Sequence, residues 1–306
     1  MKTAESIVDL IGDTPIVQLK RIGRNLKAKI YAKLELFNPT GSVKDRIAKY
    51  MIESAEKKGT LKKNSIIVEA TTGNTGISFA MMAQLKGYKM IIVMPEGMSE
   101  ERKRIIKLFG AELIFTPGGE SDVDKCIKKA SEMAKRDPRI WVAGQFSNKD
   151  NVLAHHQTGK EILHQISGRI GAFVAGVGTG GTLTGVAEVI KKKYPKCRIV
   201  AVEPAECAIL SGGKWGTHII EGIGDGFIPD ILRPELIDEV IPIRGADAVV
   251  MARRLAREEG LFCGISSGAN VLASLKVAER MDRGRVVTMI PDSGGRYLTT
   301  DLMKSL

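Results

Sequence analysis

Short apolar runs rich in valine and isoleucine alternate along the chain with longer amphipathic stretches. A continuous apolar run predicts a strand buried on both faces, and apolar residues three or four positions apart predict one face of a helix. The predicted strands are 29–34, 65–69, 89–93, 112–115, 140–142, 172–175, 198–202, 239–243 and 285–290. The predicted helices are 45–58, 76–85, 99–109, 122–136, 151–165, 183–194, 245–259 and 268–281.

This alternation predicts an α/β protein with two domains, each a parallel-rich twisted sheet flanked by helices. Polar and turn-forming residues cluster at 144–150. We therefore expect an N-terminal domain at 1–147 and a C-terminal domain at 148–306, and we allow for an early segment that crosses into the other domain. In such folds ligands bind beyond the carboxyl ends of strands, on loops that lead into helices.

Composition narrows the classes of function. The net charge of +11 would suit nucleic acid or an anionic substrate, but basic residues alternate with glutamate and only 5% of residues are aromatic. We therefore expect no nucleic-acid partner. No apolar run approaches the roughly 18 residues that a membrane span needs, so we expect no membrane association either.

Cysteine and histidine usage argues against a metal centre. The four cysteines are far apart and form no C-x-x-C pair, and the four histidines show no convincing metal-ligand spacing. Free thiols are the simpler interpretation, and they fit a reducing cytoplasm. We therefore expect a cytoplasmic protein without a metal site.

The first distinctive loop contains Lys44. It follows the predicted strand 29–34, and its Pro39 and Gly41 form a turn just before a predicted helix. A helix N-terminus disfavours a cation, so an amine placed there in an apolar cleft or near a bound phosphate can have a lowered pKa and form Schiff bases. Taken alone, a solvated surface lysine is the alternative.

The second loop, 70–76, follows the predicted strand 65–69. Its hydroxyls, its amide and its backbone N–H groups converge at the start of a helix, which suits a carboxylate or a phosphate. Plain capping by Asn74 or Thr75 is the alternative, but capping needs one such residue and this loop offers several.

The third loop, 176–182, follows the predicted strand 172–175 and is rich in glycine. Glycines let a ligand approach the backbone closely, and the N–H groups can hold a phosphate. Gly176, Gly178 and Gly181 also satisfy G-x-G-x-x-G, with Glu203 near the distance expected for ribose binding. A nicotinamide-dependent oxidoreductase therefore competes with a compact monophosphate site.

Together the loops resemble those of the cysteine synthase (O-acetylserine sulfhydrylase) and cystathionine β-synthase family, which are fold-type II pyridoxal phosphate (PLP) enzymes. The resemblance covers nearly the whole chain, through segments 11–17, 38–46, 69–76, 178–182, 264–268 and 291–297. The dinucleotide interpretation explains only one of these segments. The resemblance implies a fold like that of the tryptophan synthase β subunit, with the active site in the interdomain cleft.

The resemblance also implies roles for individual residues. Lys44 would hold PLP as a Schiff base and act as the catalytic base, Asn74 would bond the cofactor's 3′-oxygen, and Ser266, or the adjacent Ser267, would face its ring nitrogen. The cofactor's phosphate would be bound by Gly178, Thr179, Gly180, Gly181 and Thr182. The substrate carboxylate would be bound by Thr71, Thr72, Thr75 and Gln145.

The implied reaction is β-replacement through an α-aminoacrylate intermediate, which converts O-acetyl-L-serine, or a related activated serine, and sulfide into L-cysteine. The resemblance further implies a homodimer, with serine acetyltransferase as an additional partner. Cystathionine β-synthase-like chemistry, or the use of serine or cysteine as donor, remains an alternative.

The chain departs from the cysteine synthase pattern at 221–227. Glu221 stands where glutamine is usual, and Asp225 stands where a small residue is usual. By resemblance this segment borders the active site, so we predict that Asp225 contacts the substrate and affects the choice of donor. A solvent-facing or turn-capping aspartate is the alternative.

Overall fold

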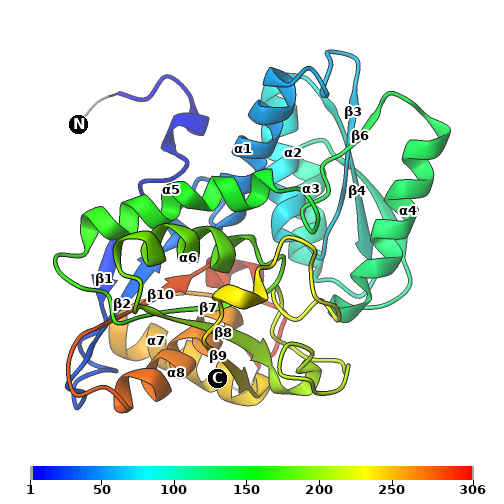
Figure 1. Cartoon of the computed structure of the whole chain (residues 1–306). Coiled ribbons are helices and arrows are strands. Elements are labelled where there is room, and N and C mark those ends of the chain that lie inside the picture. The colour runs from blue at the N-terminus through cyan, green and yellow to red at the C-terminus, as the bar shows by residue number, and fades with distance from the viewer. Residues whose placement is uncertain (1–2, 305–306) are drawn as a thin grey trace.

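The computed structural model describes residues 3–304, which form ten strands and eight α-helices (Figure 1). The strands are β1 (Ile16–Gln18), β2 (Lys29–Leu34), β3 (Ile66–Ala70), β4 (Lys89–Pro95), β5 (Glu112–Thr116), β6 (Ile140–Val142), β7 (Ala172–Gly176), β8 (Arg198–Pro204), β9 (Glu239–Ile243) and β10 (Arg285–Ile290). The helices are α1 (Lys44–Lys57), α2 (Asn74–Lys86), α3 (Glu100–Leu108), α4 (Val123–Arg136), α5 (Asp150–Gln165), α6 (Gly181–Lys193), α7 (Gly245–Glu259) and α8 (Ile265–Glu279).

The strands form two sheets. The larger has the order β1-β2-β10-β7-β8-β9, and the smaller has the order β5-β4-β3-β6. Every neighbouring pair is parallel except β1 and β2, so the predicted α/β architecture with two parallel-rich sheets is confirmed. The early strands β1 and β2 pair within the larger sheet, next to β10. The domain boundary at 147 stays a prediction.

Helices cover both faces of the larger sheet, with α5 and α6 on one face and α7 and α8 on the other (Figure 1). One buried apolar cluster joins Leu255 of α7 and Val277 of α8 to the sheet. A second cluster joins Ile162 of α5 and Val186 of α6 to its opposite face. Because helices cover both faces of the sheet, the side chains on both faces of the central strands are buried. This explains why these strands appear in the sequence as continuous apolar runs.

Besides shifts of one or two residues at several element ends, two features differ from the sequence-based prediction. Strand β1 was not predicted, because its three residues lie at a sheet edge and show no buried periodicity. Helix α8 begins at Ile265 instead of 268, so Gly268 lies inside the helix. The sequence favoured a start at this residue because glycine is unfavourable in a helix interior. A Cβ at Gly268 would collide with the Ala248 carbonyl oxygen, so the glycine allows α7 and α8 to pack closely.

None of the helices within residues 3–304 is both long enough and apolar enough to span a membrane.

Candidate active site

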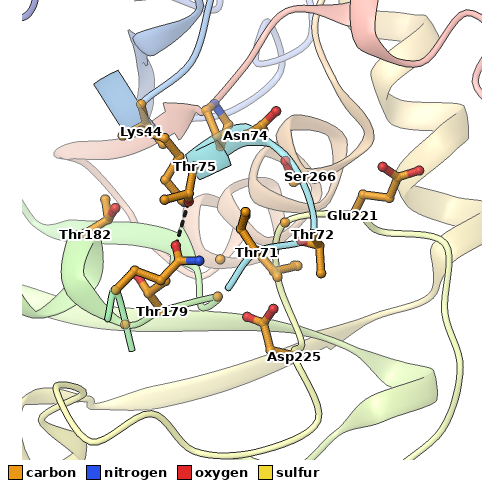
Figure 2. Close-up of a pocket in the computed structure, with 18 of the residues that line it drawn as sticks. Lys44, Thr71, Thr72, Asn74, Thr75, Thr179, Thr182, Glu221, Asp225 and Ser266 are labelled. Carbon is orange, nitrogen blue, oxygen red and sulfur yellow. Dashed lines mark hydrogen bonds between the residues drawn. The ribbon is translucent and has the colours of Figure 1, made fainter. Parts of the chain in front are cut away.

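The loops at the carboxyl ends of β2, β3, β7 and β10 meet in one pocket, as the topology of parallel sheets requires (Figure 2). All the residues predicted for the site lie in its lining, except Gly181. They are Lys44, Thr71, Thr72, Asn74, Thr75, Gln145, Gly178, Thr179, Gly180, Thr182, Asp225 and Ser266. Segments far apart in the sequence therefore converge on one pocket.

Lys44 is the first residue of α1, and its side chain reaches the pocket. The preceding loop is tied to the end of β10, because the Val43 N–H donates to the Pro291 carbonyl at 2.8 Å. Burial lowers the pKa of the Lys44 amine, and the nearby carboxylates of Asp225 and Asp292 only partly oppose this effect. The site thus favours the neutral, nucleophilic form of the amine.

The loop between β3 and α2 presents hydroxyls to the pocket. The Thr71 hydroxyl accepts a bond from the Gly73 N–H at 3.0 Å, and the Thr75 hydroxyl donates to Gln145 Oε1 at 2.6 Å, the dashed line in Figure 2. Gln145 in turn donates to the Ala70 carbonyl at 2.8 Å. The loop is therefore held in place before any ligand binds, at the N-terminus of a helix that attracts anions.

Thr72 has a partner that the sequence did not indicate. Its hydroxyl donates to Glu120 Oε1 at 2.8 Å, and the same oxygen accepts the Gly222 N–H at 2.7 Å. Glu120 thus links the hydroxyl-rich loop to the segment that carries Asp225. The Thr72 hydroxyl proton is already engaged, so this residue could offer a bound carboxylate only its backbone N–H.

The glycine-rich loop between β7 and α6 is packed so closely against other protein atoms that side chains at its glycine positions would collide with them. Gly180 has φ +83°, in the left-handed region that favours glycine, and a Cβ on Gly181 would collide with the amide of Asn151. Asn151 also donates to the Thr179 hydroxyl at 3.1 Å. The glycines therefore make room for protein atoms behind the loop, in addition to the close approach of a ligand that the sequence suggested.

Asn74 is oriented by the C-terminal motif at 291–297. Its Nδ2 donates to Asp292 at 2.6 Å, and its Oδ1 accepts a bond from Arg296. Asp292 also accepts the hydroxyl of Tyr297 at 2.6 Å. Because an amide nitrogen has two N–H groups, one donor of Asn74 remains for the pocket.

The two adjacent serines at the start of α8 are distinguished by their orientation. Ser266 lines the pocket, whereas Ser267 is fully buried and lies outside the lining. Ser266 is therefore the serine that a ligand ring could reach.

Asp225 faces the pocket and is only 6% exposed, so the solvent-facing alternative is wrong (Figure 2). Among residues 3–304, no other side chain forms a hydrogen bond with its carboxyl group. Burial, followed by the nearby charge of Glu120, raises its pKa, and Lys44 opposes this effect. The carboxyl group is thus available to a ligand.

Arg102 and Glu221 also line the pocket, and neither was predicted as a site residue. They form a buried ion pair that joins α3 to the segment before Asp225. Arg102 also donates to the Tyr297 hydroxyl at 3.1 Å. An arginine in an amphipathic helix gives no sequence signal of this contact, although the unusual Glu221 pointed to this segment.

Glu203 has no ribose-binding geometry. Its carboxylate accepts the N–H of Leu210 at 2.7 Å and both the N–H and hydroxyl of Ser211, so it fastens the following loop. The G-x-G-x-x-G match therefore lacks its acidic partner.

The residues present fit pyridoxal phosphate. An amine with a lowered pKa lies in the same pocket as a glycine-rich helix N-terminus suited to a phosphate and a second helix N-terminus suited to a carboxylate. Ser266 and the free donor of Asn74 add further polar groups to the pocket.

Comparison with known proteins gives the same assignment. The model of the family "Pyridoxal-phosphate dependent enzyme" matches residues 7–292. A cysteine synthase from Staphylococcus aureus is 47% identical over 304 residues, which is 98% of this chain and 97% of that protein. A cysteine synthase structure from Entamoeba histolytica has a TM-score of 0.95 and 44% identity, covering 100% of this chain and 92% of its own.

A hydrogen sulfide-producing enzyme from Fusobacterium nucleatum has a TM-score of 0.93 and 41% identity, covering 97% of this chain and 100% of its own. These matches confirm the resemblance and the cofactor expected from the sequence, and they exclude the dinucleotide interpretation. The chain belongs to the family of pyridoxal-phosphate dependent enzymes.

Proposed function

We propose that this enzyme forms L-cysteine from O-acetyl-L-serine and sulfide by β-replacement. The observation that carries the proposal is the convergence of Lys44, the hydroxyl-rich loop and the glycine-rich loop on one pocket. The near full-length similarity to a Staphylococcus aureus cysteine synthase supports the choice of reaction. In this reaction acetate leaves the β-carbon of the substrate and sulfide takes its place.

Bound PLP would supply an aldehyde that links to amines and a ring that draws electrons from the substrate's α-carbon. We assign the phosphate to Gly178, Thr179, Gly180, Gly181 and Thr182, the 3′-oxygen to Asn74 and the ring nitrogen to Ser266. Gly181 contributes through its backbone N–H at the first turn of α6. A neutral serine at the ring nitrogen favours prompt loss of a β leaving group over transamination.

The chain's own groups then position the substrate and move its proton. The Thr71 hydroxyl, the remaining N–H of Gln145 and the backbone N–H groups of Thr72 and Thr75 orient the substrate carboxylate, which fixes the α-carbon near Lys44. The Lys44 Nζ takes the α-proton as general base, for which its lowered pKa is suited.

The proposal is tested with purified enzyme, sulfide and four donors: O-acetylserine, O-phosphoserine, serine and cysteine. We expect the fastest cysteine formation with O-acetylserine, and an absorption band of the bound cofactor that borohydride abolishes. Absence of cysteine formation from every donor, in protein that holds PLP, would contradict the proposal.

Asp225 supports a second candidate function, the use of serine or cysteine as donor. Its carboxyl group faces the pocket without a partner side chain, where it could bond a substrate hydroxyl or a water molecule. The similarity to a hydrogen sulfide-producing enzyme from Fusobacterium nucleatum is consistent with such a donor. The donor panel distinguishes the two functions directly.

Replacing Asp225 by alanine is expected to raise relative activity with O-phosphoserine and to lower it with serine or cysteine. Repulsion between the carboxylate and a phosphate a few ångströms away costs on the order of 1–4 kcal/mol. Because the pKa of Asp225 is raised, the wild-type bias against O-phosphoserine should weaken as the pH falls and the carboxyl group is protonated. Donor ratios measured across pH check both effects.

The matched control is Asp230→Ala, because Asp230 is an exposed aspartate in the same part of the chain. It should leave the donor ratios and the cofactor spectrum unchanged. Equal donor ratios in wild type and Asp225→Ala would show that Asp225 does not select the donor.

Gly181→Ala is expected to weaken PLP binding and to destabilise the protein by about 1–3 kcal/mol, the usual effect of overpacking. The added Cβ would displace Asn151, which holds both the Thr179 hydroxyl and the Gln145 carbonyl oxygen. Gly119→Ala is the control, since a Cβ at Gly119 meets no atom within 4 Å. Fluorescence titration of the apoenzymes with PLP measures the difference, and equal affinities would refute the explanation.

We further propose a cytoplasmic homodimer that also associates with a serine acetyltransferase. The four free, buried cysteines suit a reducing compartment. The exposed apolar side chains of Leu10 and Phe37 lie in adjoining segments, because the Gly12 N–H donates to Asn38, and they offer a surface for a second copy. Light scattering of the purified enzyme, alone and mixed with a serine acetyltransferase, tests both associations.

A further inference from the structure

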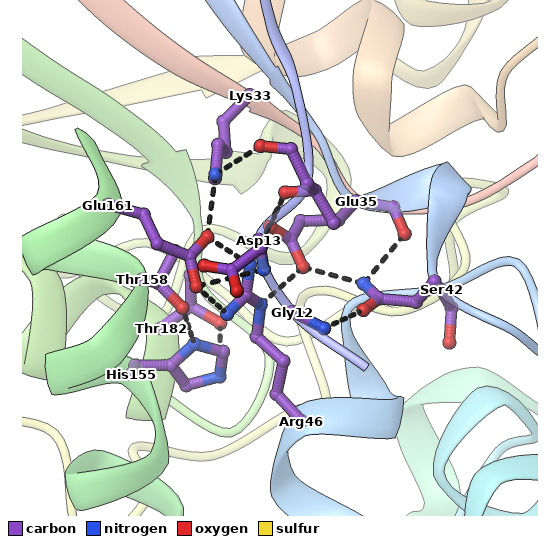
Figure 3. Close-up of polar contacts among 12 residues, drawn as sticks. Gly12, Asp13, Lys33, Glu35, Ser42, Arg46, His155, Thr158, Glu161 and Thr182 are labelled. Carbon is purple, nitrogen blue, oxygen red and sulfur yellow. Dashed lines mark hydrogen bonds and ion pairs between the residues drawn. The ribbon is translucent and has the colours of Figure 1, made fainter. Parts of the chain in front are cut away.

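His155 is a buried side chain beside the pocket to which the proposed reaction assigns no role. It lies on α5 and is 1% exposed. Its Nδ1 is 3.2 Å from the Thr158 hydroxyl and its Nε2 is 3.1 Å from the Thr182 hydroxyl. Figure 3 draws His155 with both threonines. Thr182 lines the pocket in the first turn of α6, so His155 supports the proposed phosphate site from behind.

Helix α5, which carries His155, is joined to α1, which carries Lys44. Arg46 of α1 forms a buried ion pair with Glu161 of α5 at 2.7 Å (Figure 3). Arg46 lies two residues after Lys44, and Glu161 lies less than two turns after His155. The same helix pair thus carries Lys44, which lines the pocket, and His155, which contacts the pocket residue Thr182.

The surroundings of His155 favour its neutral imidazole. Burial, followed by the nearby positive charge of Arg46, holds its pKa well below the usual value. A neutral imidazole has one N–H donor and one acceptor nitrogen, so the two threonine contacts admit two tautomers.

The Thr158 hydroxyl discriminates between these tautomers. It is fully buried, and His155 is its one side-chain hydrogen-bond partner among residues 3–304. If Nδ1 carried the proton, the hydroxyl would accept that bond and its own proton would lack a partner, which is unfavourable for a buried donor. With the proton on Nε2, Thr158 donates to Nδ1 and both groups are satisfied.

The tautomer decides what Thr182 can offer to the pocket. When Nε2–H donates to Thr182 Oγ1, the Thr182 hydroxyl proton is free to point towards a ligand. In the other tautomer Thr182 would donate to Nε2 and present only lone pairs. Phosphate oxygens at neutral pH act almost entirely as acceptors, so only the first arrangement suits them.

We propose that His155 is a positioning residue for the cofactor: its neutral Nε2–H tautomer orients the Thr182 hydroxyl to donate to the phosphate group of PLP. The hydrogen bonds run in one direction, from Thr158 to His155, from His155 to Thr182 and from Thr182 to the phosphate. This inference rests on the proposed phosphate-binding role of the loop at 178–182.

The first test uses the wild-type holoenzyme with ¹⁵N-labelled histidine, so it does not depend on the folding of a variant. The chain has four histidines, and the His155→Gln spectrum identifies the His155 signals. We expect a neutral ring protonated at Nε2 between about pH 6 and 9, on either side of the ordinary histidine pKa. A ring protonated at Nδ1, or a charged ring at pH 7, overturns the proposal.

The second test compares His155→Leu with His155→Gln by PLP affinity and by the ³¹P signal of the bound cofactor. Loss of a hydrogen bond that supports a charged group should weaken PLP binding roughly 10- to 100-fold in the leucine variant. The glutamine amide can place an N–H near the position of Nε2, so this variant should retain most of the affinity and the wild-type ³¹P shift. His156→Leu is the control, since His156 pairs with Glu188 instead.

Equal PLP affinity and an unchanged ³¹P signal in His155→Leu overturn the proposal. The Thr182→Val variant shows whether such a result refutes only the role of His155 or also the assignment of Thr182 to the phosphate. If Thr182→Val weakens PLP binding and His155→Leu does not, only the role of His155 is wrong. If neither variant changes affinity or the ³¹P signal, the assignment of Thr182 to the phosphate is wrong as well.

Discussion

The Lys44→Ala enzyme is expected to fold normally and to lose cysteine formation by more than about 10⁴-fold. Acid–base catalysis alone typically contributes roughly 10²–10⁴-fold, and this substitution removes the covalent attachment of the cofactor as well as the base. Folding should be preserved, because alanine is favourable at the start of α1 and the Lys44 amine lies in the pocket instead of packing into the core.

The measurement is steady-state cysteine formation with saturating PLP, alongside the borohydride test of the cofactor band. Lys49→Ala is the matched control, because Lys49 lies on the same helix but donates to the Val8 carbonyl at 3.0 Å, away from the pocket. Near-normal turnover by Lys44→Ala would refute its role as anchor and base.

Arg46→Met is expected to lower the free energy of unfolding by about 3–5 kcal/mol, as breaking one side of a buried ion pair generally does. Arg46 is 5% exposed and bonds two buried carboxylates, Glu35 and Glu161, each at 2.7 Å (Figure 3). Of these two carboxylates, Lys33 forms an ion pair only with Glu161, at 2.6 Å. Without Arg46, Glu35 is left as a buried carboxylate with no cation paired to it.

The same cluster predicts a pH dependence. Burial raises the pKa of Glu161, but Arg46 and Lys33 outweigh it and lower the pKa to about 2 from an ordinary value of 4.5. A group with a lowered folded-state pKa stabilises the native protein above its unfolded-state pKa and loses that contribution as the pH falls. Wild-type stability should therefore decline between about pH 4.5 and 2, with a smaller contribution from Glu161 in Arg46→Met.

Denaturant unfolding at several pH values tests both expectations. Arg244→Ala is the control, because its ion pair with Asp247 is largely exposed and should change stability by no more than about 1 kcal/mol. If Arg46→Met proved as stable as this control, the buried cluster would not contribute to stability.

Much of the site was predictable because its chemistry is local in the sequence. The loops that hold Lys44, Thr71 and Gly180 each follow an apolar strand and precede a helix. The carboxyl ends of parallel strands lie at one edge of a sheet, so such loops can be assigned to a ligand site before their partners are known. The order of these loops along the chain carried the family resemblance, and with it the fold and the cofactor.

The orientation of individual side chains was decided by tertiary structure. Glu120 meets Thr72 and Gly222 across 48 and 102 positions of sequence, and Arg102 meets Glu221 from an ordinary amphipathic helix. Asp225 was noticed in the sequence, but only the packed segment shows that it faces the pocket.

The sequence by itself determined the alternating strands and helices, and it singled out the three loops and the lysine that line the pocket, because each depends on near neighbours and on hydrophobic periodicity. Only the tertiary structure decided that the Thr72 hydroxyl bonds Glu120, that Ser266 instead of Ser267 faces the pocket, and that His155 reaches Thr182. These contacts depend on how α5, α6 and α8 pack on a sheet built from strands distant in sequence. No local pattern of residue types specifies such distances.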